Sequence, residues 1–250
     1  MLIEEQRTNV FLNSTAPATQ SFTTTASPYT ISFYGSGSIT LSGSYVAVVT
    51  GSNALIRTTL TFTPTALPLV MTVAGTITKP QLELGSFATS YIETAGSQVT
   101  RNGDQASITG TNFSSWYNQS QGCLIADADV GAGFFPTAVS LDDGGYTNRI
   151  QFQRSLLASD LNTALSCVYG TVTTFTAAST KFGVSYAQNL VYVDSNTTTV
   201  ATTTDSLRTG INNMGIGWMR GQGLYCNGHI RSIRYYSTAL PSATLQALTS

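Results

Sequence analysis

The amino-acid sequence predicts an all-β protein made of two antiparallel, jelly-roll-like β-sandwiches in tandem, followed by a short C-terminal helix. Three observations predict this class. Apolar and polar residues alternate with a period of two, the alternating stretches are rich in β-branched and aromatic residues, and glycine or proline bounds each of them. Charged residues make up only 9% of the 250 residues, against roughly 25% in an average globular protein. The expected surface is therefore polar but largely uncharged.

The first half of the chain contains a series of short stretches with this strand pattern. Residues 29–34 alternate and end at the turn Gly35-Ser36-Gly37, and later stretches stop at Pro64 and Gly75. Strands are expected at residues 29–34, 38–42, 58–63, 69–74 and 81–84. Several short strands at this spacing are typical of an antiparallel sandwich.

The second half repeats the pattern. Asp142-Asp143-Gly144-Gly145 marks a hairpin turn, because glycine adopts the positive φ angles that such turns need. Strands are expected at residues 122–130, 137–141, 148–153, 161–169, 181–186, 189–193, 215–218 and 229–236.

Two helices are considered. Residues 241–248 begin with Pro241, which the first turn of a helix tolerates, and they place Leu245 and Leu248 on one face together with Leu240. This is the expected C-terminal helix. Residues 156–165 also carry leucines at helical spacing, so a helix there stays open as the alternative to a strand.

Composition excludes several partner classes. The eleven lysines and arginines are scattered and the net charge is −1, so the basic face that nucleic acid requires is not expected. No stretch approaches the apolar length that spans a bilayer, so membrane insertion is not expected either. The start of the chain lacks a secretory pattern, which predicts synthesis in the cytoplasm. Cys123, Cys167 and Cys226 are expected to be buried free thiols.

Two segments near the ends of the first half resemble a known family. Residues 2–9, Leu-Ile-Glu-Glu-Gln-Arg-Thr-Asn, and residues 81–92, Gln-Leu-Glu-Leu-Gly-Ser-Phe-Ala-Thr-Ser-Tyr-Ile, look like the segments that bracket a carbohydrate-binding-like module of tailed-phage and prophage fibre or spike proteins. Residues 227–236 and 240–248 resemble the closing strand and short helix of concanavalin A-like, laminin-G-like domains. The resemblance implies a carbohydrate-binding-like sandwich at 1–95 and a lectin domain at 96–250.

Catalysis is not expected. His229 is the only histidine, in an expected strand, and no nucleophile elbow accompanies it. Asp127 and Asp129 lie two residues apart on an expected strand, a weak match to the paired carboxylates of a glycosidase. A capsule-degrading glycosidase is thus only a weaker alternative.

A metal is considered at the hairpin turn. Laminin-G-like domains often hold a structural Ca²⁺, and the resemblance implies that Asp142 and Asp143, with Asn148, could supply its oxygen ligands. The alternative is a solvated turn without metal. No other cofactor is expected.

Glycan binding calls for aromatic faces beside amide, carboxylate or guanidinium groups. Three clusters fit: Trp116, Tyr117 and Asn118; Asp143, Tyr146, Asn148 and Arg149; and Trp218 with Arg220. For Trp116 the alternative is a role in closing one end of the core, and for Trp218 it is a place in a core strand.

The sequence reading, taken with the resemblance, predicts a virion-displayed protein that binds host surface polysaccharide without catalysis. Its expected partners are a host glycan and other virion subunits, and a homo-oligomer is expected, with a trimer favoured because multivalency strengthens weak sugar contacts. The alternative is a purely structural decoration or scaffold protein of the virion.

Overall fold

The computed structural model describes residues 1–131, 136–145, 148–153, 162–167, 172–176, 181–187, 190–195, 198–203, 209–219 and 223–250. The chain divides into two compact units. The N-terminal unit is Gln6–Asn102, and the C-terminal unit combines Met1–Glu5 with Gly103–Ser250. The sequence places the division between residues 95 and 96, and the compact units divide seven residues later, with the first five residues joining the second unit. The chain thus enters the C-terminal unit, leaves it and returns.

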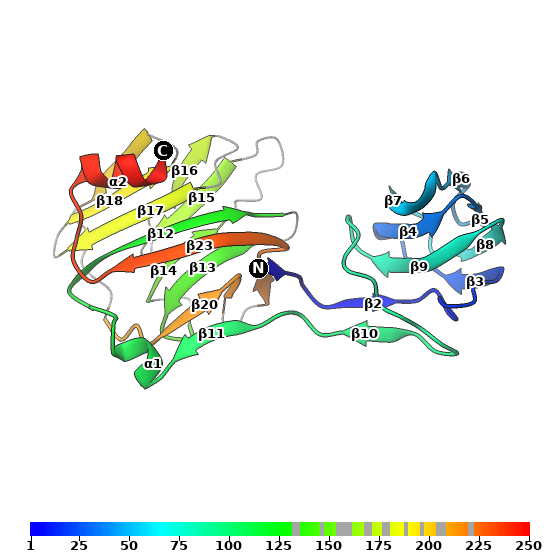
Figure 1. Ribbon diagram of the computed structural model, residues 1–250, viewed down its shortest axis with the longest axis horizontal. Helices are drawn as coiled ribbons and strands as arrows, with labels where there is room; N and C mark the ends of the chain where they lie inside the picture. Colours follow the sequence, from blue (N-terminus) through cyan, green and yellow to red (C-terminus); the bar gives the residue numbers. More distant parts are fainter. Residues whose placement is uncertain are drawn as a thin grey trace. The chain divides into compact units, whose positions relative to one another are not determined.

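The N-terminal unit is built from two antiparallel sheets and one ribbon (Figure 1). A four-stranded sheet has the order β3-β8-β5-β6, a three-stranded sheet has the order β7-β4-β9, and β2 pairs with β10. The bounds are β2 Arg7–Asn9, β3 Gln20–Thr23, β4 Tyr29–Gly35, β5 Ser38–Gly43, β6 Ala47–Thr50, β7 Asn53–Phe62, β8 Pro68–Ala74, β9 Ile77–Leu84 and β10 Val99–Arg101.

The core of this unit lies between the two sheets. Ile31 and Phe33 of β4 are fully buried, as are Ile39 and Leu41 of β5 in the other sheet. Gly35 ends β4 with a φ of 126°, and a Cβ there would lie 2.1 Å from the Thr76 carbonyl oxygen. Because only glycine accommodates both conditions, it is the residue at which the chain leaves one sheet for the other.

The C-terminal unit is a sandwich of two six-stranded antiparallel sheets (Figure 1). One has the order β1-β23-β12-β17-β18-β19 and the other β11-β20-β13-β14-β15-β16, while β21 and β22 form a two-stranded ribbon. The bounds are β1 Leu2–Ile3, β11 Ala106–Thr109, α1 Thr111–Ser114, β12 Gln121–Asp129, β13 Thr137–Asp142, β14 Arg149–Gln153, β15 Asn162–Cys167, β16 Val172–Thr176, β17 Lys181–Ala187, β18 Leu190–Ser195, β19 Thr198–Thr203, β20 Asn213–Ile216, β21 Trp218–Met219, β22 Leu224–Tyr225 and β23 Gly228–Tyr236.

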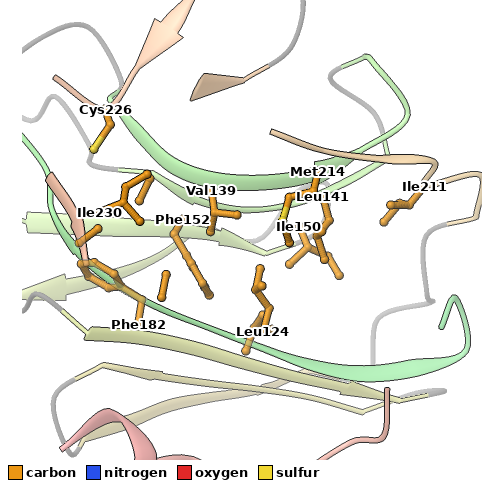
Figure 2. Close-up of a cluster of buried hydrophobic side chains, with 14 of the residues drawn as sticks. Leu124, Val139, Leu141, Ile150, Phe152, Phe182, Ile211, Met214, Cys226 and Ile230 are labelled. Atoms are coloured by element: carbon orange, nitrogen blue, oxygen red, sulfur yellow. The ribbon is translucent and has the colours of Figure 1, made fainter. Parts of the chain in front are cut away.

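Figure 2 shows the core between these sheets. Leu124 of β12 and Phe182 of β17 point from the first sheet towards Val139, Ile150 and Phe152 of the second. All five side chains are buried. This burial of one face from each sheet is what the alternating sequence predicts.

The C-terminal helix α2 (Ser242–Thr249) covers β17 and β18 on the opposite face of the first sheet (Figure 1). Its fully buried Leu245 packs against Cys123 and Ile125 of β12. A Cβ on Gly183 would lie 2.6 Å from a Leu245 methyl carbon, so the glycine lets the helix approach closely. No helix among the described residues is long and apolar enough to cross a membrane.

The predicted all-β class and the C-terminal helix are confirmed, and the strands that were expected mostly agree within one to three residues. Strands β3, β6, β11, β16 and β19 were not expected. The largest difference is at β7, which begins at Asn53, five residues before the expected start. The predicted strand 215–218 is wrong as a single element. Gly217 has a φ of 74°, which breaks the chain there into β20 and β21.

The helical alternative for residues 156–165 is wrong where it can be tested. Asn162–Cys167 forms strand β15, paired with β14 and β16. Leu156, Leu157, Asp160 and Leu161 lie outside the described residues.

Candidate functional site

An open groove of about 700 Å³ lies on the C-terminal unit. Its described lining comes from four separate stretches: the residue before β11, the β13–β14 turn, the residue before β20, and the β21–β22 ribbon. The lining residues are Gln105, Asp143, Gly144, Asn212, Trp218, Gly223 and Tyr225. Loops from distant parts of the sequence thus meet around one hollow, where a ligand can be contacted from several sides.

Two aromatic rings form one wall. Trp218 and Tyr225 are cross-strand partners in the β21–β22 ribbon, and their rings are stacked with centroids 6.4 Å apart and planes 15° apart. Trp218 is only 8% exposed, and its indole Nε1 donates a hydrogen bond to the Ala106 carbonyl oxygen at 2.7 Å. Tyr225 is half-buried. Trp218 is therefore the fixed support, and Tyr225 is the ring with more surface available to a ligand.

The loop before β11 holds Tyr225 in place. Gln105 Nε2 donates to the Tyr225 hydroxyl at 3.3 Å. A Cβ on Gly103 would lie 2.5 Å from the phenol carbon of Tyr225, so the backbone passes directly against the ring. This loop is itself tied to the start of the chain, because Glu4 and Asp104 exchange two hydrogen bonds of 2.9 Å. The first five residues thus help to position the groove.

Asp143 supplies the carboxylate of the groove. One oxygen accepts the Gly145 N–H at 2.8 Å and the other accepts the Asn148 amide at 2.9 Å. The Asp143 N–H in turn donates to the Asn148 carbonyl at 3.3 Å. Gly144, between them, has a φ of 89°. The predicted hairpin turn is confirmed, and it fixes the orientation of this carboxylate.

Asp142 has a different role from its neighbour. Its side chain is fully buried, with one oxygen accepting the Gly144 N–H at 2.8 Å and the other accepting the Ser140 hydroxyl at 2.7 Å. The Asp142 carbonyl accepts the Asn212 N–H at 3.0 Å. Asp142 therefore holds the turn and the Asn212 loop together beneath the groove.

The structure brings together some of the predicted binding residues. Asp143 and Trp218, taken from two different predicted clusters, line the same groove, and Asn148 bonds directly to Asp143. Arg149 begins β14, where its guanidinium approaches the Met219 sulfur at 3.7 Å. Tyr146 and Arg220 lie outside the described residues.

The predicted cluster of Trp116, Tyr117 and Asn118 does not line this groove. Trp116 and Tyr117 pack with Phe113 and Tyr235, with ring centroids 4.7 to 6.3 Å apart, against the hydrophobic core. Asn118 donates its side-chain amide to the Ser237 carbonyl at 2.9 Å. Burial raises the pKa of the Tyr117 phenol above its usual value. This arrangement favours the alternative considered for Trp116, a role in closing one end of the core.

Asp127 and Asp129, the carboxylates considered for a glycosidase, both lie next to the Arg231 guanidinium. Arg231 contacts Asp127 at 2.9 Å and Asp129 at 3.7 Å. The Asp129 side chain is 66% exposed, and it shares Arg231 with Asp127 in a surface ion-pair arrangement. Among the described residues, no group of three or more histidine, cysteine, aspartate or glutamate side chains is arranged to hold a metal. The Ca²⁺ expectation at Asp142 and Asp143 stays a prediction.

Sequence reasoning missed Gln105, Asn212 and Tyr225. The two amides lie in loops and carry no local pattern. Tyr225 had a usable signal, because Gly221-Gln222-Gly223 separates two short apolar-aromatic pairs and such spacing is typical of a hairpin. A hairpin there would have placed Tyr225 beside Trp218.

No protein-family model and no curated protein matches the sequence. Among solved structures, the chain resembles a carbohydrate-binding module of a sialidase, titled "Ruminococcus gnavus IT-sialidase CBM40", with a TM-score of 0.41 and 15% identity over 53% of this chain and 84% of that one. The same module, titled as bound to alpha2,3 sialyllactose, gives a TM-score of 0.39 at the same identity and coverage. These likenesses are too distant to assign the chain to a family.

Proposed function

We propose that the protein binds glycans without catalysis, and that the groove lined by Tyr225, Trp218 and Asp143 is its binding site. One observation carries the proposal: a half-buried aromatic ring, its buried aromatic support, two amides and a carboxylate from distant segments line one open hollow. Each of these groups has a matching feature on a sugar.

The aromatic wall suits the apolar face of a sugar ring. Sugars present C–H groups on one side, and these pack on aromatic surfaces. Tyr225 is held on one side by the Trp218 stack and at its hydroxyl by Gln105. Because its side chain is already ordered, little conformational entropy is lost when a ligand binds it.

The polar lining suits hydroxyl groups. Asn212 is exposed and Gln105 is exposed, and amides both donate and accept hydrogen bonds. The turn fixes Asp143 as an acceptor. Together these groups can satisfy several hydroxyls at once, which is how a shallow site obtains specificity.

A glycan array with the purified protein, followed by calorimetric titration of the best ligand, tests the proposal. Tyr225→Ala should weaken binding by about tenfold or more, as truncation of a central aromatic contact does. Tyr34→Ala, which removes a half-buried tyrosine from the N-terminal unit, is the matched control and should leave affinity unchanged. Absence of binding to every glycan would refute the proposal.

The absence of catalysis belongs to the same proposal. It is supported by the Asp127–Arg231 pairing and by the exposure of Asp129. Reducing-end assays on capsule polysaccharide should detect no release above background, and release that Asp129→Asn or Asp143→Asn abolishes would show an enzyme instead.

Display on a virion, in a trimer, is a further part of the proposal, and it rests on the sequence resemblance to phage fibre and spike proteins. Mass spectrometry and immuno-electron microscopy of purified particles would test the location. Light scattering of the purified protein would test the oligomer, with three chains per particle as the expected result.

A structural virion subunit remains the second candidate, favoured by several exposed apolar side chains on the N-terminal unit. Val46 and Val48, at β6, are 79% and 65% exposed, and Leu55 and Ile56 of the contacting strand β7 are 91% and 56% exposed. Large apolar side chains exposed to this degree would be buried if another subunit covered β6 and β7. Replacing Val48 and Leu55 with serine should impair assembly if this candidate is right, and unchanged assembly would count against it. Glycan affinity should stay unchanged, because neither residue lines the groove.

A further inference from the structure

We propose that the groove selects uncharged sugar units over anionic ones such as sialic or uronic acids. The inference rests on the proposed glycan-binding function and goes further by naming the ligand class. The feature that carries it is Asp143, whose carboxylate is held by the hairpin turn and which lines the same groove as the aromatic pair.

The first step is the geometry of Asp143. Within the part of the turn that the structure describes, each of its two oxygens accepts one hydrogen bond, from the Gly145 N–H and from the Asn148 amide. A carboxylate oxygen has room for two, so each oxygen keeps one acceptor position. Two adjacent acceptors suit two neighbouring hydroxyls of one sugar ring, both acting as donors.

The second step is the charge. Among the described residues that line the groove, Asp143 carries the only formal charge. An ionised carboxylate accepts hydrogen bonds and cannot donate them. A sugar carboxylate placed beside it would find no donor there and would meet a like charge, an arrangement that strongly disfavours binding.

The third step concerns the remaining polar groups. The Asn212 side-chain oxygen Oδ1 accepts a hydrogen bond from the Asn213 side-chain amide at 3.1 Å, which orients the Asn212 side chain. Gln105 is engaged with the Tyr225 hydroxyl at 3.3 Å. These uncharged groups can bind hydroxyls, but they offer an anionic sugar no compensating positive charge. Asp143 therefore sets the charge preference of the groove.

Calorimetry with two pairs of matched ligands tests the inference: lactose against sialyllactose, and a neutral capsule oligosaccharide against one containing uronic acid. We expect the neutral member of each pair to bind about tenfold or more tightly. The difference should narrow as salt rises from about 0.05 to 0.5 M, because ions screen the repulsion.

The outcomes separate the inference from the function on which it rests. Equal or tighter binding of the anionic members, still lost in Tyr225→Ala, would overturn the charge preference and keep the glycan-binding function. Binding of neither member, in a protein that binds nothing on an array, would overturn both. The wild-type ratios decide this without any variant at Asp143.

Asp143→Asn adds a direct test. Asparagine can still accept the Gly145 N–H, and the Asn148 amide can turn to present its oxygen, so the hairpin should persist. The neutral-to-anionic affinity ratio should fall towards one. Asp127→Asn, which removes a carboxylate from the β12 surface, is the matched control and should leave the ratio unchanged. A ratio that survives Asp143→Asn would contradict the assignment to Asp143.

Discussion

Trp218 and Tyr225 face each other across the β21–β22 ribbon, with their rings stacked 6.4 Å apart. The pair exists because Gly217, with its positive φ, turns the chain out of β20 immediately before Trp218. A Cβ on Gly217 would lie 2.4 Å from the side chain of Ile3. One glycine thus connects the first residues of the chain to the aromatic wall of the groove.

The two tryptophans are expected to respond differently to the same substitution. Trp218→Phe removes the hydrogen bond to Ala106 and should cost about 1 kcal/mol of unfolding free energy, while also weakening glycan binding. Trp116→Phe removes the hydrogen bond to Asn112 and should affect stability alone. Urea titration and calorimetry on both variants check this, and equal loss of affinity in the two would argue against the groove.

Ile3 should stabilise the C-terminal unit. It is 2% exposed and belongs to the core of that unit. Ile3→Ala should lower its stability by about 2–5 kcal/mol, while Leu2→Ala, at a side chain that is 40% exposed, should change it by less than about 0.5 kcal/mol. Both tryptophans lie in this unit, so urea unfolding followed by tryptophan fluorescence reports on it. Equal effects of the two substitutions would contradict the placement of β1.

Glu83 should be essential to the N-terminal unit. Its fully buried carboxylate accepts the Thr89 N–H at 2.9 Å and the Thr89 hydroxyl at 2.7 Å, and it lies 3.7 Å from the Arg7 guanidinium. Glu83→Ala removes the buried acceptor of the Thr89 donors and the carboxylate beside the Arg7 cation, at a cost of about 3–5 kcal/mol. The exposed Glu93→Ala is the control. Hydrogen exchange of residues 6–102 should rise in the first variant only, and unchanged protection would show that the network contributes little.

Stability should fall in alkali. Burial raises the pKa of the Cys123 and Cys226 thiols to about 12, from 9.0, and burial raises that of the Tyr186 phenol. Because the unfolded chain releases these protons first, their contribution is complete below about pH 9 and declines above it, by up to about 1.4 kcal/mol per pH unit for each group.

Thermal unfolding between pH 7 and 11 measures this decline. Cys123→Ala should make it shallower, because one of the raised groups is gone. A melting temperature that stays constant up to pH 11 would contradict the burial of these groups.

Strands such as β5 and β8 were predictable because burial of one face imposes a two-residue period. Both strands carry that period in their sequences, with Gly or Pro at their ends, whereas β12 is buried on both faces and was expected from its apolar run. Short strands were not predictable. β2, β10 and β22 contain two or three residues each, too few for any period, and they form because tertiary contacts supply partners.

The groove was predictable only in part, for a similar reason. Asp143 and its turn follow from a local Asp-Gly signal. The meeting of Asp143 with Trp218 depends on β13 and β20 pairing in one sheet, and Gln105 reaches Tyr225 across 120 residues of sequence. Local patterns do not encode these long-range contacts, so the sequence placed the two residues in separate clusters.

The central claim is that ligands bind beside Trp218, and the chain's two tryptophans allow one direct test. The indole N–H of each gives a separate proton–nitrogen NMR signal, assignable with Trp116→Phe and Trp218→Phe. On titration with the best glycan from the array, the Trp218 signal should shift in proportion to saturation while the Trp116 signal stays in place. A saturating glycan that leaves the Trp218 signal unmoved, or that moves only the Trp116 signal, would contradict the claim.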